Sequence, residues 1–565
     1  MRNLILSLVL FVTSMFSAAQ TFNMSSIQQI GSSAEDVGYS VVADLDGNIY
    51  VMGGFQYTVD FDPGPDTLLL SSNGETDVFV MKLDSGRKML WIKSFGGGNV
   101  DFGYDLATDN DGNVYISGIY ADNGDYDPGS GVFIMPNASA YNSFVSKLDK
   151  NGNFIWAKSI LGGSNAGYAL AVDSKNNVYL GGEFVEKVDF NPGQDTVEKT
   201  PNGLWDGYLL KLNEDGVFQW VQTFGGSNPD AVYSVEVDKQ DFVYTVGLFS
   251  DSADFDPGID VKTLPASYFY SGFIEKLDSN GQLIWAHTTE SNAVTEVSTL
   301  HIAGNGDIYF SGSYMGETDF DPTPDEYKIT PSGTTDHFIC KWDSAANLKW
   351  VKVFNGNSGD DCRPMSLVTD KNGFVYCAGR YVGIIDMNPN EGEYLISSQG
   401  NYDIFVQKLD SLGSFIWAES IGGMEEDRAN SICVDDIGYV YLAGSFVGTT
   451  DFNPNGPATV LTSKGDRDAF LTTFWQSGTG IIDMNCGGHG IELFPNPTSK
   501  FVYFSGLDQA RINVQVYNNM GLKVASDTFT ETEIPYLDLE KLGAGIYQVY
   551  ITDGRNNFSR KITVQ

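Results

Sequence analysis

A unit of about 65 residues recurs seven times along most of the chain, and this repeat limits the possible fold more than any other feature. A tyrosine after a turn such as DGN returns every 64 to 67 residues, at Tyr50, Tyr115, Tyr179, Tyr244, Tyr309, Tyr376 and Tyr441. The proline of a DFDPG-like segment keeps the same spacing, at Pro63, Pro128, Pro192, Pro257, Pro322, Pro389 and Pro454. A third marker, a tryptophan, is in register at Trp91, Trp156, Trp220, Trp285, Trp350 and Trp417. Such periodicity indicates an array of equal supersecondary units.

Each copy reads as four short β-strands. The strands are separated by DG, NG and NN pairs, which two-residue hairpin turns require because both central residues take positive φ. A four-stranded sheet cannot bury both faces alone, whereas seven sheets packed around an axis do so and leave only short edges. The sequence therefore predicts an all-β fold, a seven-bladed β-propeller over residues 20–475 with about 65 residues per blade. An open stacked array, the alternative, would need polar capping units at both ends, and we see none.

Six tryptophan strands for seven copies leave one strand to be supplied from elsewhere. Residues 26–31 (SIQQIG) align with the end of a tryptophan strand, and residues 480–488 (GIIDMNCGG) are the alternative. We expect the N-terminal segment to complete the last blade, because pairing the first strand with the last blade closes the ring and removes an exposed edge. Residues 476–490 are then a linker.

Residues 491–565 do not follow the pattern of the repeats. The strands VYF, INVQVYN, GIYQVYI and RKITV alternate with NNMG and DG turns, which predicts a small antiparallel β-sandwich. An ordinary sandwich appended for binding is one interpretation. However, four motifs in order, LFPNP at 493–497, YNNMG at 517–521, LDLEKLGAGIYQV at 537–549 and the final KITV, resemble the C-terminal sorting domain (type A) of the Bacteroidetes type IX secretion system. The resemblance implies recognition by that machinery and export across the outer membrane, usually with removal of the domain.

The repeats themselves resemble the SBBP family of β-propeller repeats over about residues 22–475. That resemblance implies a secreted bacterial protein. The N-terminus agrees, because one early basic residue, an apolar run at 4–16 and a small-residue end at Ala19 indicate a Sec signal peptide over residues 1–19, cleaved near Ala19. The run is too short to span a bilayer, so we expect no transmembrane segment and a secreted or cell-surface location.

Charge and cysteine content exclude other classes. With 33 basic and 73 acidic residues the net charge is -40, so a nucleic-acid partner is excluded because phosphate backbones need a cationic surface. The five cysteines are odd in number and have no CxxC spacing, which argues against a zinc site and a disulfide framework. Catalytic motifs such as HExxH and GxSxG are absent and the four histidines are scattered, so we assign no catalytic residue.

The DFDPG-like segments contain the candidate metal ligands. In four copies two aspartates stand two apart in an extended stretch, so both carboxylates point to one side; in the other three the second residue is Asn191, Asn388 or Asn453. Such oxygens suit Ca²⁺, and the candidate pairs are Asp60 and Asp62, Asp125 and Asp127, Asp254 and Asp256, and Asp319 and Asp321. The alternative is an Asx turn that ends a strand. The turns at 44–48 and 109–113 look faintly like calcium loops, but we interpret them as plain hairpins.

A position six residues before the lysine of the third strand varies between copies and is aromatic in four of them. These candidates for ligand binding are Tyr141, Trp205, Tyr270 and Tyr402. Rings beside carboxylates suit stacking on sugars or holding a peptide, whereas between blades they would be packing residues. We therefore expect a non-enzymatic binding or display module for a glycan or protein. The alternative is a secreted hydrolase or lyase with carboxylates at the propeller channel.

Overall fold

The computed structural model describes residues 21–477 except 45, 63–65, 138–140, 257–261, 267–269 and 437. Beyond them it describes residues 492–494, 501–505, 511–518, 522–530, 536–539, 542, 545–552 and 557–564. Two compact units are present: Ser26–Phe474, called the propeller unit below, and Met1–Ser25 together with Trp475–Gln565. The expected signal peptide with its cleavage near Ala19, and most of the expected 476–490 linker, lie outside the described residues.

Every regular element in the described residues is a strand, which confirms the all-β class. Seven sheets of the propeller unit each contain four main strands in one order, inner, second, third and outer. The inner strands are β2 (Val37–Ala43), β6 (Asp101–Thr108), β10 (Asn165–Val172), β16 (Ala231–Val237), β23 (Thr295–Ile302), β29 (Asp361–Thr369) and β35 (Arg428–Val434). The second strands are β3 (Ile49–Asp60), β7 (Val114–Tyr120), β11 (Val178–Phe184), β17 (Val243–Phe249), β24 (Ile308–Tyr314), β30 (Val375–Val382) and β36 (Val440–Phe446).

The remaining strands complete the blades. The third strands are β4 (Leu69–Leu83), β8 (Asn142–Leu148), β14 (Asp206–Leu212), β20 (Ser271–Leu277), β27 (Asp336–Trp342), β33 (Asp403–Leu409) and β39 (Asp468–Ser477). The outer strands are β5 (Met89–Phe95), β9 (Phe154–Gly162), β15 (Phe218–Phe224), β21 (Leu283–Thr288), β28 (Leu348–Gly356), β34 (Phe415–Gly423) and β1 (Thr21–Ile30). Short strands between second and third strands are β12 (Val188–Asp189), β13 (Glu198–Lys199), β18 (Ser252–Asp254), β19 (Thr263–Pro265), β25 (Thr318–Asp319), β26 (Lys328–Ile329), β31 (Ile384–Asp386), β32 (Leu395–Ser397), β37 (Thr449–Asp451) and β38 (Val460–Thr462), and β22 (Glu290–Ser291) follows β21.

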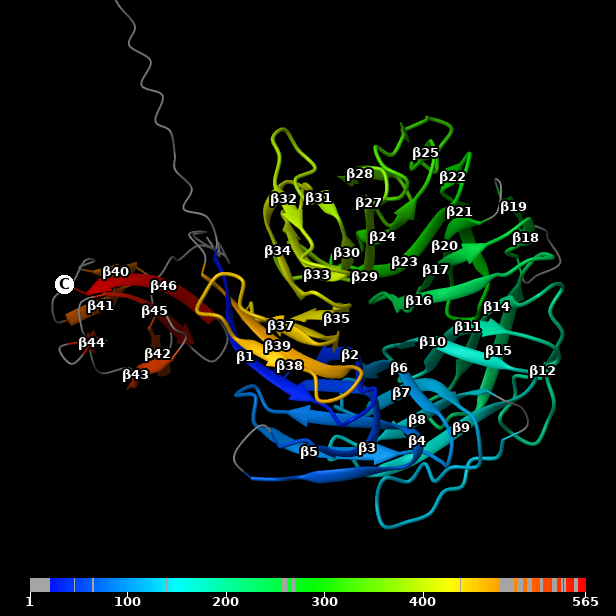
Figure 1. Ribbon diagram of the computed structural model, residues 1–565, viewed down its shortest axis with the longest axis horizontal. Helices are drawn as coiled ribbons and strands as arrows, with labels where there is room; N and C mark the ends of the chain where they lie inside the picture. The colour runs from blue at the N-terminus through cyan, green and yellow to red at the C-terminus, as the bar shows by residue number, and fades with distance from the viewer. Residues whose placement is uncertain are drawn as a thin grey trace, which may run out of the picture. The chain divides into compact units, whose positions relative to one another are not determined.

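The inner strands form a closed ring. Each one contacts the inner strand of the next blade, from β2 through β6, β10, β16, β23 and β29 to β35, and β35 contacts β2. Figure 1 shows the seven sheets radiating from this ring. Closed rather than stacked packing is what the β-propeller requires, because both faces of every sheet are then covered by its two neighbours.

The N-terminal segment closes the ring, as expected. The outer strand of the last blade is β1, which neighbours β39 in the sheet order β1-β39-β36-β35. The Gln29 amide donates to Thr462 O at 2.9 Å, and Thr472 Oγ1 donates to Ser26 O at 3.2 Å. The first and last strands of the repeat region therefore share one blade.

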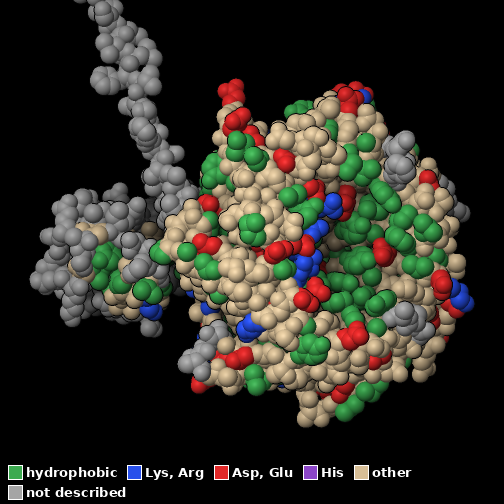
Figure 2. All heavy atoms as spheres, in the orientation of Figure 1, with side chains coloured by type: hydrophobic (Ala, Val, Ile, Leu, Met, Phe, Trp, Pro, Cys, Tyr) green, Lys and Arg blue, Asp and Glu red, His purple; other side chains and the backbone are tan. Residues whose placement is uncertain are grey.

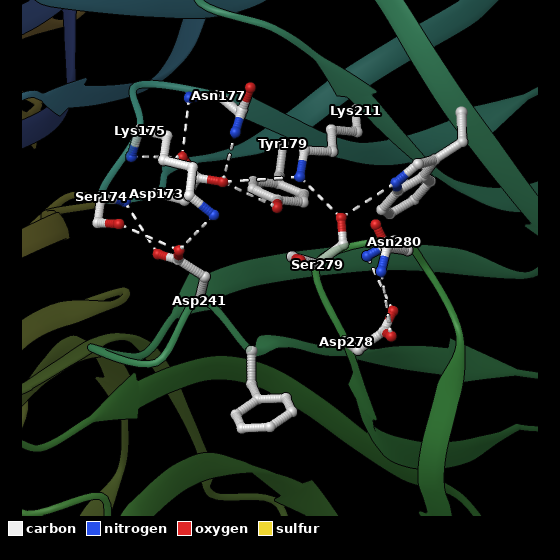
Figure 3. Close-up of polar contacts among 12 residues, drawn as sticks. Asp173, Ser174, Lys175, Asn177, Tyr179, Lys211, Asp241, Asp278, Ser279 and Asn280 are labelled. Atoms are coloured by element: carbon white, nitrogen blue, oxygen red, sulfur yellow. Dashed lines mark hydrogen bonds and ion pairs between the residues drawn. The ribbon is translucent and has the colours of Figure 1, made fainter.

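The repeated tyrosine, lysine and tryptophan form one polar cluster between adjacent blades (Figure 3). In one copy Asp173 Oδ1 accepts the N–H groups of Lys175 and Asn177, both at 2.9 Å, and Asp173 Oδ2 accepts Tyr179 Oη–H at 3.1 Å. The Lys211 ammonium lies 3.6 Å from Asp173 Oδ2 and donates to Ser279 O of the next blade at 2.7 Å. Trp220 Nε1 donates to the same carbonyl at 3.4 Å.

The turns that look like calcium loops belong to this cluster. Asp44 and Asp109 use Oδ1 to accept two backbone N–H groups of their own turns and Oδ2 to accept the hydroxyl of the next tyrosine. Both turns are thus hairpins held by an internal carboxylate, as predicted.

Pairs of buried aspartates join four of the seven blade junctions. One carboxylate belongs to a third strand and the other begins or directly precedes the next inner strand. The pairs are Asp77 with Asp101, Asp206 with Asp230, Asp403 with Asp427, and Asp468 with Asp36. Two further junctions have Asn142 with Asn165 and Ser271 with Thr295 in these places. At these two junctions uncharged residues replace both members of the pair, whereas the seventh junction keeps one buried aspartate, Asp336, opposite Cys362.

The paired carboxyls hold protons more tightly than free ones. Burial, reinforced by Asp77, raises the pKa of Asp101 from 3.8 to about 7. Burial likewise raises the pKa of Asp230 and of Asp427 to about 7, with Asp206 and Asp403 adding to the shift. Among the described residues, Oδ1 of Asp77, Asp206 and Asp403 has no hydrogen-bond partner. Each of these oxygens belongs to a carboxyl whose charge raises the pKa of the other carboxyl of its pair.

The C-terminal unit contains two antiparallel sheets in its described residues. One has the order β40 (Glu492–Phe494), β41 (Phe501–Ser505) and β44 (Tyr536–Asp538). The other has the order β43 (Lys523–Thr530), β42 (Arg511–Tyr517), β45 (Gly545–Thr552) and β46 (Asn557–Val564). Val514, Val516, Val549 and Ile551 are buried, so alternate residues of β42 and β45 cover one face, as in a small β-sandwich. No helix in the described residues is long and apolar enough to cross a membrane.

Candidate functional site

The four aromatic candidates lie at equivalent blade junctions. Their carbonyls accept N–H groups from the start of the next blade, where Tyr141 O pairs with Asn165 N (3.1 Å), Trp205 O with Asp230 N (3.0 Å), Tyr270 O with Thr295 N (3.2 Å) and Tyr402 O with Asp427 N (2.7 Å). The inner strands begin at this end of the propeller unit, which we call the upper face. Tyr141 is 42% exposed and the other three rings are half-buried. They form a partly exposed rim position, and their role in binding stays a prediction.

A second set of side chains at the upper face was not expected from the sequence. Every inner strand has a β-bulge, at which one residue is skipped in the pairing with the second strand. The skipped residues are Tyr39, Tyr104, Tyr168, Tyr233, Ser298, Met365 and Asn430. A bulge turns its residue out of the alternating pattern, so these side chains leave the sheets at the innermost ring.

The four tyrosines of this set form a continuous arc across blades one to four. Ring centroids are 5.7 Å apart for Tyr39 and Tyr104, 5.5 Å for Tyr104 and Tyr168, and 6.2 Å for Tyr168 and Tyr233. Tyr168 Oη–H donates to Glu183 Oε1 at 2.8 Å. The hydroxyls of the other three have no hydrogen-bond partner among the described residues. We call these four residues the tyrosine arc.

Blades six and seven carry arginines at the same face. Of the five arginines between residues 26 and 474, four lie here, at Arg363, Arg380, Arg428 and Arg467, which we call the arginine sector. Arg363 and Arg380 pair across β29 and β30, and Arg428 begins β35. Arg467 occupies the rim position that is aromatic in four other blades. In Figure 2, blue and red side chains gather at the centre of the propeller unit, next to an area coloured as hydrophobic.

One carboxylate connects two of these arginines. Glu426 Oε1 accepts from Arg380 Nη1 at 2.6 Å and Glu426 Oε2 accepts from Arg467 Nη2 at 2.8 Å. The Arg380 guanidinium also lies 4.6 Å from the centre of the Tyr402 ring, and Tyr402 Oη–H donates to Asp361 Oδ2 at 2.7 Å. Tyr402 thus joins the rim to the arginine sector.

Two glutamates with raised pKa values also belong to this face. Burial raises the pKa of Glu183, and burial raises that of Glu296 against the opposing effect of Arg363. Both glutamates raise the pKa of Tyr233, after the larger effect of its burial. Both therefore lie near the tyrosine arc.

The DFDPG-like segments fold as Asx turns. In all seven copies Oδ1 of the first aspartate accepts the N–H groups two and eight residues later; for Asp60 these are Asp62 N at 3.1 Å and Leu68 N at 2.9 Å. The residue between the two acids is buried in the blade, as Phe61 is. No group of three or more His, Cys, Asp or Glu side chains in the described part of the chain is arranged to hold a metal ion. Calcium binding by these pairs stays a prediction.

The cysteines in the described residues, Cys340, Cys362, Cys377 and Cys433, are buried free thiols. Cys486 lies outside the described residues.

Comparison with known proteins identifies the two parts of the chain. A family model described as a secretion system C-terminal sorting domain matches residues 492–565, and a model described as a β-propeller repeat matches residues 26–53. Regulatory protein FlaEY of Caulobacter vibrioides is 28% identical over 79% of this chain, and an uncharacterized WD repeat-containing protein of Acanthamoeba polyphaga mimivirus is 20% identical over 84%. The chain spans 47% and 39% of these two relatives, less than half of each.

Among solved structures, the Pan2 WD40 domain of Neurospora crassa covers 80% of this chain and 96% of its own, with 8% identity and a TM-score of 0.38. A member of the DUF4221 family from Bacteroides vulgatus covers 82% of this chain and 98% of its own, with 10% identity and a TM-score of 0.30. The chain thus combines a β-propeller that matches the SBBP repeat with a type IX C-terminal sorting domain, which indicates a secreted or cell-surface protein.

Proposed function

We propose that this protein is a non-enzymatic binding or display module, exported by the type IX system through residues 491–565, whose propeller binds an extracellular glycan or protein at the upper face. The export part rests on the sorting-domain match. The binding part rests on where the seven copies differ.

The observation that carries the proposal is the contrast between the two ends of the blades. At the hairpin end six of the seven copies repeat the hydrogen bond from the tyrosine hydroxyl to the turn aspartate, and only the fifth copy, with Ala303 in place of the aspartate, departs from it. At the upper face, equivalent positions hold tyrosine, serine, methionine or asparagine at the bulges, and threonine, tyrosine, tryptophan or arginine at the rim. Packing that is the same in every blade is made by the same residue type at each equivalent position. A surface that contacts an asymmetric ligand needs different residue types at those positions.

A screen of the full chain on glycan and protein arrays, with and without calcium, tests the proposal. The wild-type protein is compared with Trp205→Ala and with Arg87→Gln, because Arg87 lies in the hairpin between β4 and β5 at the opposite end of the strands. We expect selective binding that the rim substitution weakens and the hairpin substitution leaves intact. Absence of any selective ligand, or equal loss in both variants, contradicts the proposal.

A specific observation also supports the alternative of a hydrolase or lyase. Glu183 and Glu296 both lie near Tyr233 of the tyrosine arc, and burial raises the pKa of each; a raised pKa makes a carboxyl better suited to act as a general acid. Product analysis after incubation with the ligand found on the array separates the two functions. Cleavage that Glu183→Gln or Glu296→Gln abolishes assigns the enzyme; recovery of intact ligand assigns the binding module.

A further inference from the structure

The arginine sector has more positive charge than its carboxylates neutralise at close range. Three guanidiniums, those of Arg380, Arg428 and Arg467, surround Glu426. Arg428 has no ion pair in the described residues, and its Nε donates only to Ser445 Oγ, at 3.2 Å. Glu35 lies 3.8 Å from Arg467, and Asp361 pairs with Arg363 at 2.8 Å. Arg428 is therefore the guanidinium left for another anion.

Burial of Arg428 makes an anionic partner still more favourable for it. Its partial burial lowers its pKa, and the nearby Arg467 lowers it further. A desolvated cation next to another cation destabilises the free protein, and a bound anion removes this unfavourable interaction energy. The chain has a net charge of -40. Because four of the five arginines of the propeller unit lie at this one place, they create a local positive potential that attracts anions.

The tyrosine arc begins beside this cation. Asn430 of β35 donates its amide to Gly38 O of β2 at 2.8 Å, which places the bulges of the last and first blades side by side. Arg428 and Arg467 both lower the pKa of Tyr39, against the larger effect of its burial, so their charges lie near its hydroxyl. An anion on Arg428 is therefore next to a row of ring edges and hydroxyls.

We propose that the upper face binds a glycan whose sugars carry carboxylates, with one carboxylate on Arg428 and the following sugars along the tyrosine arc. This inference rests on the proposed binding function and names its ligand class. A guanidinium accepts a carboxylate in a bidentate, charge-assisted geometry, and sugar rings present hydroxyls for the free hydroxyls of Tyr39, Tyr104 and Tyr233.

Hydrogen bonding on the arc favours a glycan over an acidic peptide. Glu183 and Glu296 lie near Tyr233, where their carboxylates accept hydrogen bonds from sugar hydroxyls, which a run of glutamate side chains lacks. A uronic-acid oligomer combines these hydroxyls with a carboxylate for Arg428. We therefore name an oligouronate as the ligand class.

Titration calorimetry of the full chain with a tetragalacturonate tests the inference. The matched ligand is the same tetramer with its carboxyls methyl-esterified, and a tetraglutamate peptide is the third ligand. We expect the acidic sugar to bind at least about tenfold more tightly than its ester, because hydrogen bonds to a charged group contribute about 1.5–3 kcal/mol. Arg428→Gln removes that difference, and Arg87→Gln retains it.

A second variant keeps the test decisive if Arg428→Gln does not fold. Tyr104→Phe keeps the ring contacts of the arc and removes one free hydroxyl, and it is expected to weaken the acid and its ester by the same factor. Equal affinity for acid and ester, or tighter binding of the peptide, overturns the inference. If the arrays find a different ligand that depends on the rim, the proposed function stands while this inference fails.

Discussion

The junction carboxylates predict that the propeller loses stability as the pH rises through neutrality. The perturbation is the double substitution Asp77→Asn with Asp101→Asn, which copies the natural Asn142 and Asn165 junction of the next blade. Asn165 already shows that an amide satisfies this place, because its Oδ1 accepts Ser143 N at 2.8 Å and its Nδ2 donates to Gly163 O at 2.9 Å.

The sign follows from proton binding. The pKa of Asp101 is about 7 in the fold against 3.8 for an ordinary side chain, so between these values the folded state binds more protons than the unfolded chain. Stability is therefore fully present at low pH and falls as the pH rises toward and through 7. Each tenfold change in proton affinity corresponds to about 1.4 kcal/mol, so ionising this one carboxyl costs the fold about 2–3 kcal/mol between pH 5 and pH 8.

The assay is reversible urea unfolding of the full chain, for wild type and double variant, at pH 5 and pH 8. The buried histidines His287 and His337, whose pKa values burial lowers to about 4 and about 3, act on both proteins equally and cancel in the difference. The variant should gain about 2–3 kcal/mol over wild type on going from pH 5 to pH 8 from the loss of Asp101, and the loss of Asp77, whose pKa burial raises to about 6, adds to that gain. The control Asp46→Asn removes an exposed carboxylate of the first blade and should show no such gain. If the double variant and wild type differ by the same free energy at both pH values, the reasoning is refuted.

Four further predictions follow from the fold and the site. Deleting residues 20–31 should destabilise the propeller in a melting experiment, whereas deleting 476–565 should not; the reverse would assign the closing strand elsewhere. Removing residues 491–565 should leave a folded propeller in the periplasm of the host, and normal appearance in the medium would disprove sorting. If the Asp pairs bind Ca²⁺, a hundredfold excess over the dissociation constant stabilises the fold by about 2.7 kcal/mol, which chelator removes; identical melting with Ca²⁺, Mg²⁺ and chelator would leave them as turns. Trp205→Ala should weaken a ligand by about 1–3 kcal/mol with little change in melting temperature, whereas a packing role would cost about 3–5 kcal/mol of stability.

Much of the propeller fold was predictable because its contacts lie within one repeat or between equivalent positions of adjacent blades. The tyrosine, lysine and tryptophan markers recur because each makes the same hydrogen bonds to its own turn and to the next blade, as Tyr179, Lys211 and Trp220 do. The closing strand was predictable for the same reason, since residues 26–31 occupy the place of a missing tryptophan strand. Residues that recur in the sequence thus make the same contacts in successive blades.

The centre of the upper face was not predictable in this way. Tyr39 and Tyr104 stand within apparently ordinary strands, and only the bulge, a shift of one residue in pairing, turns them onto the innermost ring. The arginine sector combines an inner strand, a second strand and a rim residue from two blades, as Arg428, Arg380 and Arg467 show. A recurring tyrosine three residues after the junction position, in DVGY, DFGY, NAGY and DAVY, was the available signal.

The most direct test of the account is a crystal structure of the full chain with the ligand selected by the array screen. We expect the ligand to lie on the upper face, in contact with the tyrosine arc and at least one rim position such as Trp205. A ligand held at the hairpin end of the blades, or on the C-terminal unit alone, would contradict it.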